Sequence, residues 1–229
     1  MLKASDSPAD GRAARWKEHN QQRRAEVVEA AVNAIEDEGI DVSVRRIAQR
    51  LNLPRPVVYR HFDGREDLDE QVRRRIVEML LAELTPTLVP DGTLRDAIRH
   101  AVGTYLAWID RHPRLHHFLI TGSRDRQAVT SRAVTGARTT VAARIERLVA
   151  AGLDAHGLDA DLARPTAFGM LGLVDAVVNG WHSGETEALT STTLTGFLTT
   201  SLCSMLSGNA RAVGIELDPD TPLRGLLGE

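Results

Sequence analysis

The chain has 229 residues, with 28 basic and 31 acidic side chains and a formal net charge of −3. Its composition, 42% hydrophobic and 26% charged, is typical of a folded globular protein and argues against a disordered chain. The single cysteine, Cys203, excludes an intramolecular disulfide and a zinc site built on two cysteines. The longest charge-free stretch, 188–210, is too rich in Thr, Ser and Asn to span a membrane, and we expect a cytoplasmic protein without a signal peptide.

The charge is unevenly distributed along the chain. Residues 42–65 hold six arginines and one acidic residue, a net charge of +5, and residues 1–25 carry a further +3. The rest of the chain is therefore acidic. A basic segment on an acidic body is typical of a phosphate-binding region, although a charge run is also typical of a solvated surface. The spacing of the residues has to distinguish the two.

Apolar residues recur at helical spacing along the chain and almost nowhere alternate as in a strand, which predicts an all-α fold. The first clear helix has an apolar face that begins at Val27, and Gly39 suits the left-handed residue that ends it. Ser43 is a good N-cap for a short second helix over 44–51. Asn52, the non-glycine residue best suited to a left-handed turn, follows that helix.

A third helix of about two turns is predicted to begin near Pro56, because proline disfavours helical angles at Arg55 and itself suits the first helical position. Asp63 and Glu66 have the spacing of a capping box and predict the start of a longer fourth helix, which ends near Pro86. Two short helices joined by a tight turn, with a third packed across them, predict a helix-turn-helix.

The third helix carries a polar outer side. Val58 and Phe62 are four residues apart and can be buried together. The remaining side chains, at the start of the helix or on its outer side, are Arg55, Pro56, Val57, Tyr59, Arg60 and His61. Basic and aromatic residues thus gather at the end of the helix that would enter a major groove first, which indicates DNA binding.

Beyond residue 90 the pattern predicts a second, larger helical domain. Helices are expected over 94–109, 113–120, 129–151, 162–181 and 194–206, followed by a loose tail. No internal repeat is visible.

Residues 42–48, 51–53 and 57–68 resemble the DNA-binding segment of the tetracycline-repressor (TetR) family, and the helix end at 30–39 fits the same pattern. The likeness covers about residues 24–70. Asn52 stands where the family usually has glycine, and Pro54 where it usually has a small polar N-cap. The resemblance implies an all-α homodimer, which we divide into a flexible basic arm (1–20), a helix-turn-helix domain (21–70), an effector-binding and dimerisation domain (71–208) and a C-terminal tail (209–229).

The resemblance also implies the DNA contacts. Base edges would be contacted by Arg55, Pro56, Val57 and Arg60, since arginine can bond guanine O6 and N7 together and valine can pack on a thymine methyl group. Phosphates would be bound by Ser43, Arg45, Tyr59, His61 and Arg65, which fixes register without reading sequence. For the basic arm, phosphate or minor-groove contact and no contact at all both stay open.

Two sets of residues in the larger domain are candidates for binding surfaces. Small residues and a following apolar stripe permit close helix approach at a dimer interface, although they also suit a monomer core: Gly169, Gly172, Ala176, Gly180, Phe197, Leu198, Leu202 and Met205. Aromatic and apolar side chains with a few polar anchors suit a small-molecule pocket, although such a stripe is also typical of core: Tyr105, Trp108, His112, His116, Phe118, Arg144, Phe168, Met170, Asp175 and Asn179.

Catalytic motifs are missing from the sequence. His112 and His116 are four residues apart, but a third ligand and an acid at recognisable spacing are absent, so we expect neither a metal site nor a cofactor. The sequence thus predicts a transcriptional regulator, a repressor that binds operator DNA and is released by a small molecule. The alternatives are a DNA-binding protein of the same fold controlled by a protein partner, and a helical metal-binding enzyme.

Overall fold

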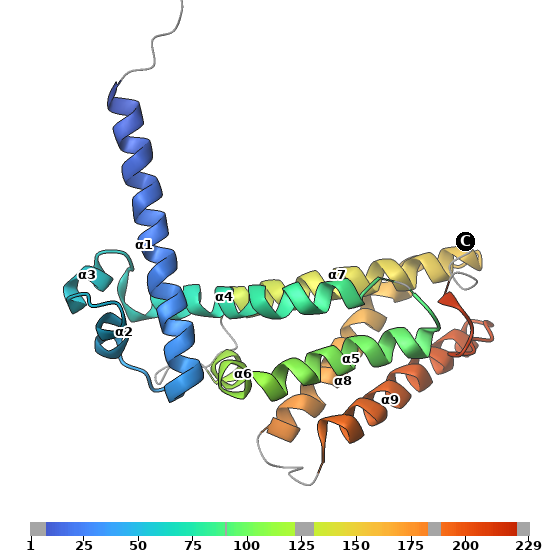
Figure 1. Ribbon diagram of the computed structural model, residues 1–229. Helices are drawn as coiled ribbons and strands as arrows, with labels where there is room; N and C mark the ends of the chain where they lie inside the picture. The colour runs from blue at the N-terminus through green and yellow to red at the C-terminus, as the bar shows by residue number, and fades with distance from the viewer. Residues whose placement is uncertain (1–7, 90, 122–130, 183–188, 224–229) are drawn as a thin grey trace, which may run out of the picture.

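The computed structural model describes residues 8–89, 91–121, 131–182 and 189–223, and the side chains within this part from residue 18 onward. These residues form α-helices and one short 3₁₀ helix, and no strand occurs among them, which confirms the all-α prediction (Figure 1). The helices are α1 (Pro8–Glu38), α2 (Val44–Arg50), α3 (Arg55–Tyr59), α4 (Gly64–Thr87), α5 (Leu94–Arg111), α6 (Pro113–Ile120), α7 (Arg132–Ala155), η2 (Ala160–Leu162), α8 (Ala163–His182) and α9 (Ser191–Ala212).

The fold has a small head and a larger helical body. Figure 1 shows α2 and α3 beside the lower half of α1 at one end, and α4 running from the head along the body. Apolar residues of α1, α2 and α3, among them Ala31, Ile47 and Val58, are buried with Leu68 at the start of α4. The head is therefore held together by its own core and is continuous with the body through α4.

The turns of the head follow the sequence prediction closely. The Ser43 side chain accepts a hydrogen bond from the Arg46 backbone N–H at 3.2 Å and caps α2. Asn52 has φ +52° and Gly39 has φ +95°, so both adopt the predicted left-handed conformation. Only asparagine, aspartate and glycine adopt this conformation readily, which explains how Asn52 makes the turn without a glycine.

The predicted capping box does not form. The Asp63 side chain makes no capping bond, and instead the Asp63 backbone N–H donates to Asp67 Oδ2 at 3.1 Å. Asp63 still occupies the N-cap position, and Gly64, at φ +87°, is the first residue of α4. Helix α3 is also shorter than predicted, since regular helix ends at Tyr59.

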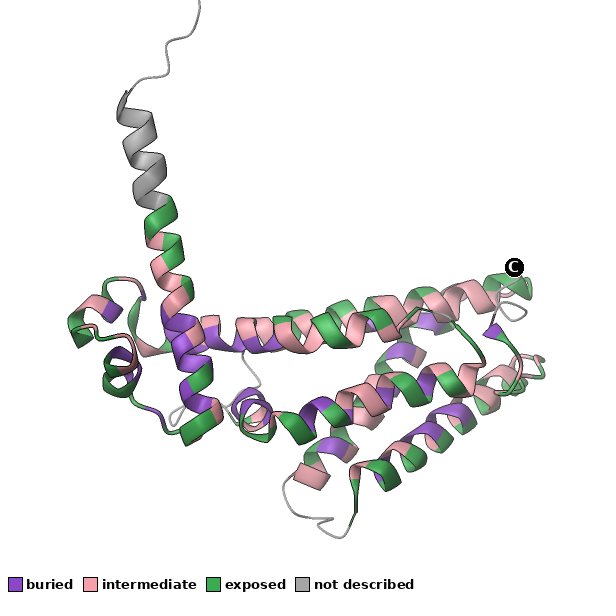
Figure 2. Cartoon of the chain, viewed as in Figure 1, coloured by how far each residue is buried: buried purple, intermediate pink, exposed green. Residues whose placement is uncertain are grey.

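The body consists of α4 to α9. Helix α5 packs against α4 and α9, and α7 packs against α4 and α8. Figure 2 shows buried residues along the facing sides of these helices. Among the described residues, no helix is long and apolar enough to cross a membrane.

The segment expected to be a loose tail is bonded to the body as far as it is described. Helix α9 continues to Ala212, and Leu223 N–H donates to Gly92 O at 2.9 Å. Arg95 bonds Asp220 through two nitrogens, at 2.6 and 3.0 Å. The remaining tail residues, the first residues of the basic arm and the predicted start of α7 at 129–130 lie outside the described residues.

Candidate nucleic-acid interface

Helix α3 has one buried side and one exposed side. Val58 is buried against the head, and so is Phe62, three residues beyond the end of the helix. Four predicted DNA-contacting residues are exposed and line a shallow surface groove: Arg55, Pro56, Tyr59 and Arg60. Arg55 lies over the Tyr59 ring, with its guanidinium carbon 5.3 Å from the ring centroid, and its Nη2 donates to the Tyr59 hydroxyl at 3.3 Å. The groove thus combines cationic and aromatic groups, as a nucleic-acid contact requires.

Two of the six clustered arginines face the acidic end of α1 instead. Arg46 Nε donates to both carboxylate oxygens of Glu38 at 2.9 Å. Arg50 bonds Glu38 at 2.5 Å and Asp37 at 2.8 Å. These arginines lower the pKa of Glu38, which stays ionised and neutralises part of the local charge. The net charge counted along the sequence therefore overstates the charge available to DNA.

Arg65, a predicted phosphate contact, also holds the head together. Its Nε donates to Asp69 Oδ1 at 2.7 Å and its Nη1 to Val42 O at 2.9 Å. Asp69 is buried, and this burial raises its pKa while the Arg65 charge acts in the opposite direction. The start of α4 is thus tied to the loop before α2, a structural role that residue spacing alone did not predict.

Further cationic groups reach the end of α3 from α1. Arg24 Nη2 donates to Asp67 Oδ2 at 3.2 Å, and the guanidinium carbon of Arg24 lies 4.8 Å from the centroid of the Phe62 ring. The pKa of His61 is lowered by burial first and then by nearby positive charges, those of Arg23, Arg24, Arg60 and His19. His19 and Arg23 were not among the predicted contacts, because only the fold brings the middle of α1 beside the end of α3.

A second group of predicted site residues meets where α5 joins α6. The Tyr105 hydroxyl lies 3.3 Å from His116 Nε2, and the Trp108 and His112 rings are 5.1 Å apart. Burial raises the pKa of Tyr105, so the hydroxyl stays protonated. His182 of α8 joins this cluster, with its ring 4.9 Å from that of His116. The sequence prediction missed His182 because the contact joins two distant helices.

The other pocket candidates are dispersed. Phe118 and Met170 are buried, and Arg144 Nε donates to Leu88 O at 3.4 Å. Asp175 forms an ion pair of 2.7 Å with Arg138 of α7. Phe168 and Asn179 are exposed on α8, so the structure does not place them with the aromatic and histidine residues of α5 and α6.

The dimer candidates divide into two groups. Leu198 and Leu202 are buried within the chain, and Met205 packs against the same core. The small residues of α8 are exposed or half-buried, Phe197 of α9 is 54% exposed and Phe168 of α8 is 51% exposed. An apolar surface groove between α8 and α9 is lined by Ala176, Val177, Gly180, Leu189, Leu194 and Phe197.

Known proteins resemble both the head and the whole chain. Residues 27–72 match the family model of the bacterial regulatory proteins of the tetR family. An HTH-type transcriptional regulator of Mycobacterium tuberculosis is 25% identical over 206 residues, which cover 90% of this chain and 86% of that protein. Both likenesses are to regulatory proteins, the second of them an HTH-type transcriptional regulator.

Solved structures share the fold. A tetR-family transcriptional regulator from Streptomyces coelicolor superposes with a TM-score of 0.64 at 20% identity, over 91% of this chain and 87% of that chain. The transcriptional regulator FadR from Bacillus subtilis, solved in complex with stearoyl-CoA, gives a TM-score of 0.60 at 16% identity, over 79% of this chain and 98% of that chain. The head thus matches the DNA-binding domain of the tetR-family regulatory proteins, and the chain as a whole shares the fold of a solved tetR-family regulator.

Proposed function

We propose that the protein is a repressor whose two copies bind a near-palindromic operator through α3. The observation that carries this proposal is the composition of the exposed side of α3, where Arg55 and Arg60 make no ion pair within the described residues. Arg46 and Arg50, by contrast, are neutralised by α1. The charge left for DNA is thus concentrated on the side of the helix that would enter the major groove.

The proposed contacts are those that the sequence predicted. Arg55, Pro56, Val57 and Arg60 contact base edges, while Ser43, Arg45, Tyr59, His61 and Arg65 hold phosphates. Their partial or full exposure supports the assignment, since each side chain is accessible on the head.

Dimerisation through α8 and α9 would present the two heads at the spacing of one helical turn of DNA, about 34–36 Å. The exposed Phe168 and Phe197 and the groove between the helices support this assignment. Large aromatic side chains that are half exposed are typical of a surface that becomes buried by a partner.

The effector would bind among the aromatic and histidine residues of α5, α6 and α8. The effector would release the protein from DNA if it bound more tightly to a conformation of the body in which the two heads are not spaced to fit the operator. By linkage, DNA would then weaken effector binding by the same factor. Because the FadR neighbour was solved with stearoyl-CoA, acyl-CoA thioesters are the first compounds to test.

Selection of bound genomic fragments with purified protein would yield the operator, and fluorescence anisotropy would then compare variants. We expect Arg55→Ala to weaken operator binding by about 1–3 kcal/mol and to relax the sequence preference at one base pair. Arg50→Ala is the matched control, because Arg50 is paired with α1 and should leave base preference unchanged. If both variants rank operator mutants as the unmodified protein does, α3 does not read DNA as proposed.

The effector arm of the proposal is tested by titrating stearoyl-CoA, and then a wider compound collection, into the protein–operator complex. Release of DNA at concentrations that leave the free protein folded supports control by a small molecule. Failure of the whole collection would favour control by a protein partner.

A further inference from the structure

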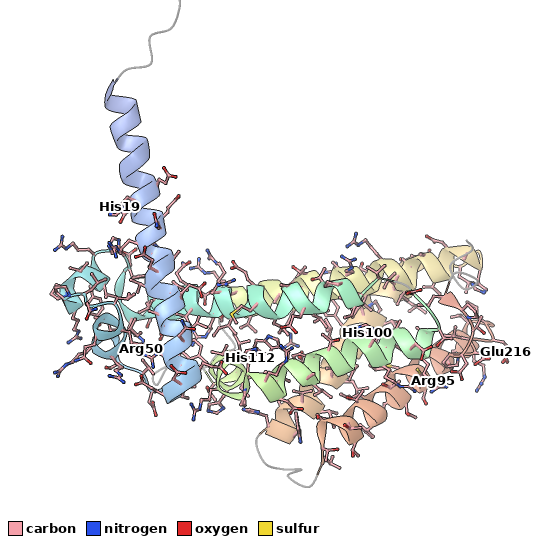
Figure 3. The ribbon with its side chains drawn as sticks, in the orientation of Figure 1. His19, Arg50, Arg95, His100, His112 and Glu216 are labelled. Atoms are coloured by element: carbon pink, nitrogen blue, oxygen red, sulfur yellow. The ribbon has the colours of Figure 1, made fainter. Side chains whose placement is uncertain are left out.

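Helix α4 holds a buried positive charge where it packs against α6. Arg73 is 7% exposed, and its guanidinium carbon lies over the Phe118 ring of α6, 4.9 Å from the ring centroid. Within the described part of the chain, Arg73 makes no hydrogen bond and no ion pair. Figure 3 shows side chains filling the space between α4 and α5, with His112 at the end of that space nearer the head. A buried charge destabilises the fold unless it is paired, so Arg73 calls for a partner.

The two acidic residues within one helical turn of Arg73 already have other partners. Asp69 Oδ1 accepts from Arg65 Nε at 2.7 Å. Asp69 Oδ2 and Arg73 Nε are fully covered, and neither has a hydrogen-bond partner among the described residues. Glu70 turns to α7, where it accepts from the Ser131 hydroxyl at 2.9 Å. Arg65 and Arg73 thus share one carboxylate, which leaves a positive charge for an anion from outside the chain.

The arrangement of the guanidinium determines which anion it suits. The Phe118 ring covers one side of the group, and the N–H groups at its edge stay free to donate. Arg73 Nε is fully covered, whereas Nη1 and Nη2 are not, so the outer edge is open to a small solute. A planar fork of N–H groups matches the two oxygens of a carboxylate and binds them through two parallel hydrogen bonds.

We propose that Arg73 anchors an anionic effector, a small organic acid whose carboxylate accepts hydrogen bonds from the guanidinium beside Phe118. This anchor adjoins the aromatic and histidine residues proposed above for the effector, because Phe118 and His116 belong to the same short helix, α6. The regulatory meaning of the anchor rests on that proposed function, whereas carboxylate binding is a property of the free protein.

The Arg73 Nε–H group gives a direct readout in the free, full-length protein. Because this N–H is fully covered, it should exchange slowly enough with water to be observed by NMR of nitrogen-labelled protein. Its resonance is assigned by its loss in Arg73→Met. Sodium acetate, titrated at constant ionic strength, should shift the resonance and saturate in the millimolar range, whereas acetamide, the uncharged isostere, should leave it in place. Absence of an acetate-specific shift would overturn the proposal.

Unfolding in urea separates ligand binding from a structural role. Acetate should raise the urea midpoint of the unmodified protein relative to acetamide, and this difference should be lost in Arg73→Met. Arg73→Lys keeps the charge with a single donor group and should retain part of the difference. Arg75→Met is the matched control on the same helix, because Arg75 is paired with Glu29 and its loss should leave the acetate effect intact.

The same variants are compared without either compound. Arg73→Met should then unfold at a midpoint no lower than that of Arg75→Met, because an apolar side chain replaces an unpaired buried charge. A midpoint well below that of Arg75→Met would assign Arg73 to balancing Asp69 and would overturn the proposal. An equal acetate effect in the two methionine variants would overturn it as well, since the anion would then bind elsewhere. DNA is absent from every sample, so a failure of operator binding or release would leave these results unchanged.

Discussion

Acidification should destabilise the body through His116, whose side chain on α6 is 2% exposed. Its Nε2 lies 3.3 Å from the Tyr105 hydroxyl, and its Nδ1 has no hydrogen-bond partner among the described residues. Burial, and then the imidazoles of His182 and His117, lower its pKa from 6.5 to about 4. The folded protein therefore keeps this imidazole neutral at pH values where the unfolded chain protonates it.

The direction of the pH effect on stability follows from proton binding. Between pH 6.5 and about 4 the unfolded chain binds a proton at His116 and the folded chain does not, so acid favours unfolding. The stability contributed by the neutral form is fully present above pH 6.5 and is lost as the pH falls through this window. At about 1.4 kcal/mol per pKa unit, the full loss is about 3 kcal/mol, and about 2 kcal/mol of it appears by about pH 5.

Urea unfolding at about pH 7.5 and 5 would measure this loss in the unmodified protein and in His116→Gln. Glutamine keeps an amide near the Tyr105 hydroxyl but does not titrate. The comparison is needed because burial raises the pKa values of Asp69 and Asp175, and their protonation in acid acts in the opposite direction. The free energy of unfolding should fall with acid by about 2 kcal/mol less in the variant. Parallel pH profiles of the two proteins would refute the assignment to His116.

Three further predictions concern the fold and the assembly. Leu106→Ala should lower the free energy of unfolding by about 2–5 kcal/mol in denaturant titrations, because the side chain is fully buried and leaves a cavity. In the same titrations, Asn52→Val should lower the free energy of unfolding by about 1–2 kcal/mol and Asn52→Gly by well under about 1 kcal/mol, since the position has φ +52°. Equal losses in the two variants would contradict the argument from backbone conformation. If the proposed dimer forms through α8 and α9, Phe197→Glu should convert it to a monomer in light scattering after size exclusion, while Thr200→Glu, exposed on the same helix, should not.

Local features were predictable because neighbouring residues decide them. The apolar period of α5, the N-cap at Ser43 and the left-handed turn at Asn52 each depend on residues within about four positions of one another. The burial of Val58 and Phe62 was predictable for the same reason, because the two residues are only four positions apart.

The features that the sequence predicted wrongly lie where the same residues can form more than one set of bonds. Asp63 has the spacing of an N-cap, but Gly64 takes a left-handed angle and Asp67 binds the Asp63 backbone instead. Residues 213–223 look like a tail by composition, but their bonds to the start of α5 hold them on the body.

Residue types and spacing in the sequence determined the helices, the head and its basic character. Only the tertiary structure decided which charges remain accessible, because Arg46 and Arg50 are neutralised by acids of another helix. It also brought His182 to His116 and Arg114 to the end of α1. Helix formation depends on bonds four residues apart and is encoded locally, whereas ion pairs and ring contacts between helices depend on packing, which no local pattern specifies.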